Sequence, residues 1–84
     1  MNIYIFENVH TVVLRNGDLL LCAMVFEPGR ANDIRGTVQI YGDKHTIYKV
    51  QIHTVFGFEE IKKIQNFLDA EGERLWTEQL KQML

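Results

Sequence analysis

The chain has 84 residues, of which 46% are hydrophobic and 24% charged, and its formal net charge is −2. These values exclude the disordered class and predict a single globular domain over residues 1–84, with a core so small that a dimer interface would help to stabilise it. Nine Lys and Arg stand against eleven Asp and Glu without a long run of either sign, which disfavours a nucleic-acid-binding surface.

The only cysteine, Cys22, excludes an internal disulfide and favours a reducing compartment, so we expect a cytoplasmic protein. The N-terminus lacks the basic and apolar regions of a signal peptide. The longest apolar run, residues 19–26, is far shorter than the ~20 residues that a membrane-spanning helix needs. The sequence therefore predicts neither standard export nor a membrane span.

Residues 2–6 (NIYIF) are aromatic and β-branched, which is typical of a strand. Glu7 and Asn8 follow as a short turn or bulge. Two alternatives stay open, namely a separate first strand or the start of one long bent strand that reaches Leu14.

Residues 10–26 (HTVVLRNGDLLLCAMVF) predict a tight hairpin, because Asn16-Gly17 between apolar runs is the type I′ turn pattern. A two-residue loop would pair Leu14 with Leu19 and Val13 with Leu20. One face would then hold Val12, Leu14, Leu19 and Leu21, and the other would hold Val9, Val13, Leu20, Cys22 and Met24. Since both faces are apolar, both need a cover, and we expect the second face to be a protein interface.

The longest expected loop, residues 27–33 (EPGRAND), contains the Pro28-Gly29 turn signal. It carries Arg30 and is followed by Arg35. Loops of this kind often carry contacts, so both arginines are candidate contact residues.

Residues 37–56 predict a second hairpin with the clean alternation of a half-buried strand pair. Its even positions are mostly apolar and its odd positions mostly polar, which places Tyr48 and Phe56 on the core face. Parity favours a loop of three residues (42–44 or 43–45) or of five, for example with Ile40 opposite Tyr48 and Val38 opposite Val50. We expect a glycine near the αL position of this loop.

Residues 58–84 switch to the period of an amphipathic helix. A continuous helix would be roughly 40 Å long and would overhang a domain of this size. Either Gly72 ends a first helix and a second begins near Glu73, or the helix continues and its far half packs on another chain. The break at Gly72 is the preferred alternative.

The sequence contains no clear catalytic, metal-binding or phosphate-binding motif. The apolar neighbours of Cys22 predict a buried side chain rather than a nucleophile, and the spacing of the three histidines matches no zinc motif. The six glycines are isolated, so no phosphate-binding loop is expected. We therefore predict no catalytic residues, no cofactor and no metal.

Several residues remain as candidates for binding. Trp76 lies on the predicted helix, and the preferred interpretation is a core residue. The alternative is an anchor residue of a protein interface. The interface candidates are Val9, Val13, Leu20, Met24 and Trp76, and the candidates for loop or polar-face contacts are Arg30, Arg35, Tyr41, Lys49 and His53.

The predicted fold is α+β, with an antiparallel sheet of four to five strands from two consecutive β-hairpins and one or two C-terminal helices packed on one face. The predicted function is a small non-enzymatic protein-interaction module, an adaptor or stoichiometric inhibitor that forms a homodimer, comparable with accessory proteins of phages and mobile elements. One alternative is a nucleic-acid-associated regulator. A second is a ligand-binding domain or an enzyme with a pocket around Cys22 and His10.

Overall fold

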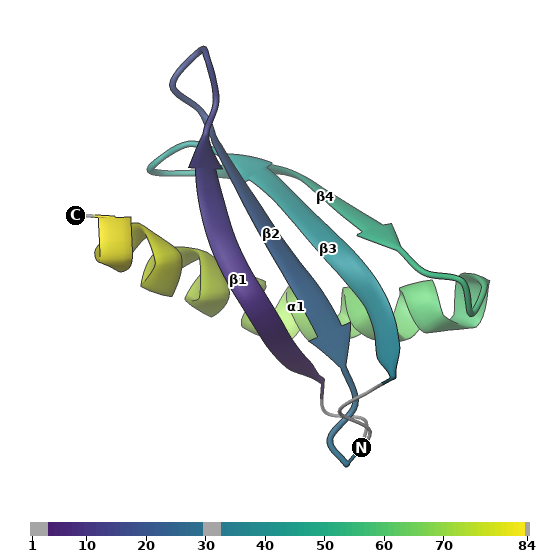
Figure 1. Ribbon diagram of the computed structural model, residues 1–84. Helices are drawn as coiled ribbons and strands as arrows, with labels where there is room; N and C mark the ends of the chain where they lie inside the picture. Colours follow the sequence, from purple (N-terminus) through teal and green to yellow (C-terminus); the bar gives the residue numbers. More distant parts are fainter. Residues whose placement is uncertain (1–3, 30–32, 84) are drawn as a thin grey trace.

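The computed structural model describes residues 4–29 and 33–83, which form one sheet and one helix. The elements are β1 (Ile5–Val13), β2 (Leu19–Phe26), β3 (Ile34–Gly42), β4 (Ile47–His53) and α1 (Phe58–Met83). The strands are antiparallel in the order β1-β2-β3-β4, and α1 crosses one face of this open sheet (Figure 1). The predicted α+β class and the two hairpins are confirmed.

The first strand is long and bent by a bulge. The register of β1 against β2 shifts between Glu7 and His10, and Asn8 inside the bulge has φ 52°. Asparagine tolerates this left-handed conformation better than most residues. For the described part of the N-terminus, the long bent strand is thus the correct alternative, whereas residues 2 and 3 lie outside the described residues.

The turn of the first hairpin differs from the prediction. Val13 pairs with Leu19 and Val12 with Leu20, so the loop covers residues 14–18 instead of two residues. Of the two central residues only Gly17 has positive φ, at 88°, and a type I′ turn needs both. The side chain of Asn16 instead accepts a hydrogen bond from the backbone N–H of Asp18 at 3.0 Å, which stabilises a wider loop.

This change of register moves side chains between faces. A shift of one residue turns a whole strand over relative to its partner. Val9 packs against the core on the helix side, and Val13 shares that side because it lies opposite Leu19. Leu20 and Met24 point to the opposite side of the sheet. The predicted grouping of these four residues on one face is therefore wrong.

The second hairpin keeps the predicted parity as far as Tyr41, but it has neither the example pairings nor the predicted loop of three or five residues, because residues 43–46 separate the Gly42–Ile47 pair. Ile40 lies opposite Val50 and Val38 opposite Ile52, and the register shifts before Gly42 pairs with Ile47. The turn is organised by the Asp43 carboxylate, which accepts hydrogen bonds from the backbone N–H groups of His45 and Thr46 at 2.7 Å each.

Three predictions about this hairpin are wrong as a result. Tyr48 is 56% exposed instead of facing the core, because the register shift leaves it without a partner on β3, and its hydroxyl donates to Asp43 on the loop. Gly42 does not adopt positive φ, since the Asp43 carboxylate closes the turn without a left-handed residue there. The strand β4 ends at His53, so Phe56 lies beyond it and is 45% exposed.

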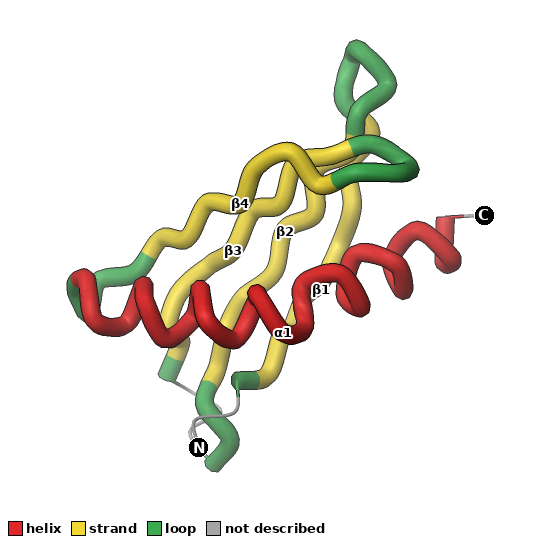
Figure 2. The backbone as a smooth tube through the Cα atoms, turned by 180° about the vertical axis from the view of Figure 1, so that it is seen from behind, coloured by secondary structure: helices red, strands yellow, loops and turns green. Residues whose placement is uncertain are grey.

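The core lies between the sheet and α1, as Figure 2 shows from the helix side. It is made from alternate residues of β2 and β3 and one stripe of α1. Its buried hydrophobic members are Tyr4, Leu19, Leu21, Ala23, Val25, Val38, Ile40, Ile64, Leu68, Leu75 and Trp76. One charged residue, Glu60, is also buried, and its Oε1 accepts a hydrogen bond of 2.8 Å from the Tyr4 hydroxyl.

The helix does not break at Gly72. It runs unbroken for 26 residues, starting on the β4 side and extending beyond β1 at its C-terminal end (Figures 1 and 2). Leu75 and Trp76 lie beyond Gly72 and are 8% and 5% exposed. Each such burial contributes about 1.5–3 kcal/mol, more than the ~1 kcal/mol that a glycine costs inside a helix. The packing of α1 therefore overrides its weakest position.

Candidate interaction surface: the open face of the sheet

The side of the sheet opposite α1 is uncovered by any described element, and we call it the open face. The strand registers arrange its residues in four cross-strand rows. From the hairpin tips towards the other end these are Val12–Leu20–Tyr41–Lys49, His10–Cys22–Gln39–Gln51, Glu7–Met24–Thr37–His53 and Ile5–Phe26–Ile34.

The half of the open face formed by β1 and β2 is mostly apolar, with Glu7 and His10 as its polar members. Leu20, Cys22 and Met24 occupy alternate positions of β2 on this face and are half-buried. Val12 at one end is 45% exposed and Ile5 at the other is 43% exposed. An apolar stripe thus runs the length of the sheet without a helix over it, and uncovered stripes of this kind mark binding surfaces.

The half formed by β3 and β4 is mostly polar. Glutamine, threonine, lysine and histidine side chains occupy it, together with Tyr41. Its neighbours on β1 add one carboxylate, Glu7, and one imidazole, His10. Positive and negative groups are therefore balanced, and the open face lacks the cluster of cations that phosphate backbones attract.

Cys22 and His10 lie directly opposite each other in the second row. The Nδ1 atom of His10 is 2.8 Å from the carbonyl oxygen of Asn8, which orients the ring. Within the described residues, no three His, Cys, Asp or Glu side chains are grouped so that they could hold a metal ion. The pair is brought together as the enzyme alternative requires, but Cys22 is half-buried among apolar side chains instead of lying in an electropositive pocket.

The predicted interface residues separate into two groups. Leu20 and Met24 lie on the open face, whereas Val9 packs on the core and Trp76 is buried in it. Trp76 packs inside the chain and its indole N–H donates to the Asp43 carbonyl oxygen at 3.3 Å. The core interpretation of Trp76 agrees with this position, and a role as an exposed anchor does not.

Three of the predicted polar contacts, Tyr41, Lys49 and His53, lie on the open face. Arg35 does not contribute a free charge, because its guanidinium lies 3.2 Å from Glu27 and 4.6 Å from the centre of the Phe56 ring. Arg30 lies outside the described residues.

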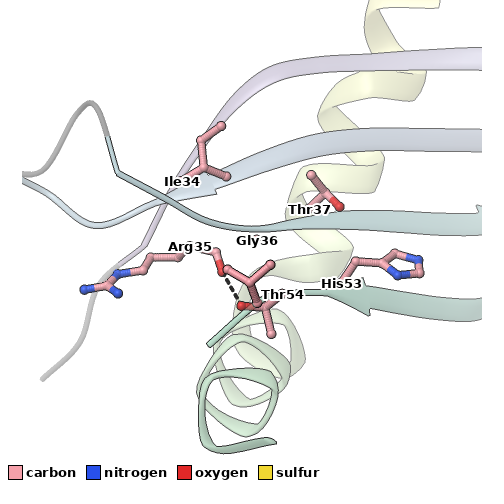
Figure 3. Close-up of a pocket in the computed structure, with 7 residues that line it drawn as sticks. Ile34, Arg35, Gly36, Thr37, His53 and Thr54 are labelled. Atoms are coloured by element: carbon pink, nitrogen blue, oxygen red, sulfur yellow. Dashed lines mark hydrogen bonds between the residues drawn. The ribbon is translucent and has the colours of Figure 1, made fainter. Parts of the chain in front are cut away.

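A shallow apolar pocket of about 430 Å³ adjoins the open face where β3 and β4 meet the loop before α1. Figure 3 shows Ile34 and Thr37 on the same side of β3, and Thr54 beside Arg35, whose carbonyl oxygen accepts a hydrogen bond of 2.7 Å from the Thr54 hydroxyl. The pocket has few polar groups that could converge on a ligand, because the Arg35 guanidinium is directed away from the strand pair (Figure 3). The pocket therefore extends the apolar surface of the open face and lacks the polar groups of a typical ligand site.

Sequence reasoning missed two apolar features. Ile5, Val12 and Ile34 are exposed on the open face, and only the strand register assigns them there. The loop before α1 presents Val55 at 93% and Phe58 at 67% exposure. The run VFGF was a signal for this loop, since Gly57 with φ 88° ends the strand pattern before the helix begins.

No family model, curated protein or solved structure matches the chain. None of the helices in the described part of the chain is long and apolar enough to cross a membrane. The function is therefore inferred from the chemistry of the chain's own surface.

Proposed function

We propose that this protein is a small non-enzymatic interaction module that binds a protein partner through the open face of its sheet. One observation carries the proposal, namely the apolar stripe of Val12, Leu20, Cys22, Met24 and Ile5, which has no cover among the described elements. An antiparallel sheet with one free face normally has polar residues there, and half of this face is apolar instead.

The proposed role is that of an adaptor or stoichiometric inhibitor in the cytoplasm. The cytoplasmic location is supported by the single free thiol, Cys22, which a reducing compartment keeps unmodified. A stoichiometric mode is supported by the chemistry of the open face, which offers apolar area and balanced charge in place of a deep pocket with converging polar groups.

The proposal is tested by capture of partners with the immobilised protein and two variants. Leu20→Asp places a charge in the middle of the apolar stripe, while Gln39→Asp adds the same charge in the polar half. Neither side chain belongs to the core, so both variants are expected to keep the circular dichroism spectrum of the wild type and to unfold cooperatively.

We expect proteins from cells that produce this chain to be retained by the wild type and by Gln39→Asp, and to be lost with Leu20→Asp. Equal retention by all three proteins would show that the open face is not the binding surface. The role of a nucleic-acid regulator gains no support from the structure, because the accessible charges of the open face are balanced.

A further inference from the structure

We infer that the occupant of the open face is a second copy of this chain, packed sheet on sheet. The two copies are related by a two-fold axis that lies between the sheets, parallel to their planes and perpendicular to the strands. This inference rests on the proposed function and names the partner. The four rows of the open face match one another when one copy is turned over onto another.

The apolar stripe decides the direction of the axis. An axis parallel to the strands would place β1 and β2 of one copy over β4 and β3 of the other, so that Cys22 would face Gln39 and apolar side chains would face polar ones. An axis perpendicular to the strands places each strand over its own copy. A parallel axis between β1 and β2 would cover the apolar side chains too, but it would place Glu7 over Met24 of the second copy and leave β3 and β4 uncovered. The perpendicular axis covers the apolar side chains and all four strands, and so removes more surface from water.

The centre of the stripe decides the position of the axis. The four rows have their midpoint between the second and third rows, between Cys22 and Met24 on β2. Rotation about this point places Cys22 over Met24 of the second copy, and places Val12 over Ile5 of the second copy. These exposed aliphatic side chains then cover each other at both ends of the stripe.

The same rotation matches the charges. Glu7 and His10 are the β1 members of the third and second rows, so each faces the other residue of the second copy. Two symmetric carboxylate–imidazole contacts result, one on each side of the axis. On β4, Gln51 faces His53 of the second copy, and the polar half acquires hydrogen-bonding partners. An isologous interface needs this kind of self-complementarity.

The area is sufficient for a weak to moderate dimer. Four strands about 4.8 Å apart and four rows about 7 Å apart cover on the order of 500 Å² of flat sheet. The accessible surface of a layer of side chains exceeds its flat area and approaches the roughly 800 Å² per partner of a standard interface. The packing is that of a β-sandwich, with sheets about 10 Å apart.

The test exchanges the two side chains across the axis, and the association state of the full chain is measured by light scattering and analytical ultracentrifugation. Glu7→Lys removes the carboxylate that faces His10, and His10→Glu places like charges opposite each other. The double variant restores opposite charges with their positions exchanged. We expect the wild type to be a dimer, each single variant to raise the dissociation constant about tenfold or more, and the double variant to return it to within about threefold of the wild type.

A second readout uses the thiol. Cys22 is covered in the dimer and only half-buried in the monomer, so its reaction with a maleimide slows as the protein concentration rises in the wild type and not in Leu20→Asp. A monomeric wild type, or a dimer in which the double variant is no better than the singles, would overturn the inference. If the chain is monomeric but captures another protein in a Leu20-dependent way, the proposed function stands and only the second copy is excluded.

Discussion

The indole of Trp76 lies against the backbone of Gly42, so closely that a Cβ on this glycine would be 2.9 Å from Cζ2 of the ring. The same indole donates its N–H to the carbonyl oxygen of Asp43, the next residue, at 3.3 Å. One side chain of α1 thus holds the far end of the helix to the turn between β3 and β4. Trp76 belongs to the same buried stripe of α1 as Ile64, Leu68 and Leu75.

Gly42→Ala is expected to destabilise the protein by about 1–3 kcal/mol, in the range of other substitutions that overfill a packed site. The added methyl group would collide with the carbonyl oxygen of Thr46 as well as with the indole, and a backbone atom cannot move aside easily. Urea unfolding followed by Trp76 fluorescence measures the change. An unfolding midpoint equal to that of the wild type would contradict this packing.

Gly72→Ala is expected to have the opposite effect and serves as a matched comparison. A Cβ at this position would only make ordinary contacts, 3.9 Å from two atoms of Leu68. Alanine is favoured over glycine inside a helix by up to about 1 kcal/mol, so the free energy of unfolding should rise by up to this amount. If instead the variant unfolds at lower urea concentration, the helix would be interrupted at Gly72.

Tyr4→Phe is expected to cost about 1–3 kcal/mol, because it leaves the buried Glu60 carboxyl group without its hydroxyl donor. The aromatic ring and its edge-on contact with Phe67 at 5.7 Å are retained. The loss is read from chemical unfolding at neutral pH. The conservative control is Glu60→Gln, and the double variant should cost less than the sum of the two single variants.

Stability should also fall at alkaline pH. Burial, followed by the hydrogen bond to Glu60, raises the pKa of Tyr4 well above its ordinary value. A group whose pKa is higher in the folded state stabilises the protein fully below the unfolded pKa of about 10, and this stabilisation is lost as the pH rises further. The free energy of unfolding should therefore begin to drop near pH 10 and continue to drop above it, and this drop should be smaller in Tyr4→Phe.

The phenol of Tyr48 should titrate late for a different reason. Its hydroxyl donates to the Asp43 carboxylate, which raises the pKa of Tyr48 to about 12 and lowers that of Asp43. Asp43→Asn removes the charge while an amide oxygen can still accept the turn hydrogen bonds. Ultraviolet titration of the tyrosines should then show one phenol moving back towards an ordinary value of about 10. An unchanged titration curve would contradict the contact.

The local patterns of the sequence determined most of the fold. Alternation along residues 37–56 predicted the parity of the second hairpin, and the helical stripe around Ile64 and Leu68 predicted α1, because these periods are properties of the backbone itself. The length and composition similarly supported the expectation of one compact domain. Such signals depend on neighbouring residues and are visible without tertiary contacts.

The register and the continuity of α1 were decided only by the tertiary structure. The Asn8 bulge and the five-residue loop around Gly17 changed the pairing of β1 with β2, and a shift of one residue exchanges the faces of a strand. Gly72 lies within the helix because Trp76 is buried beyond it. The residues of the open face, on which both proposals rest, are for this reason a property of strand pairing, which acts over distances in the chain that no local pattern encodes.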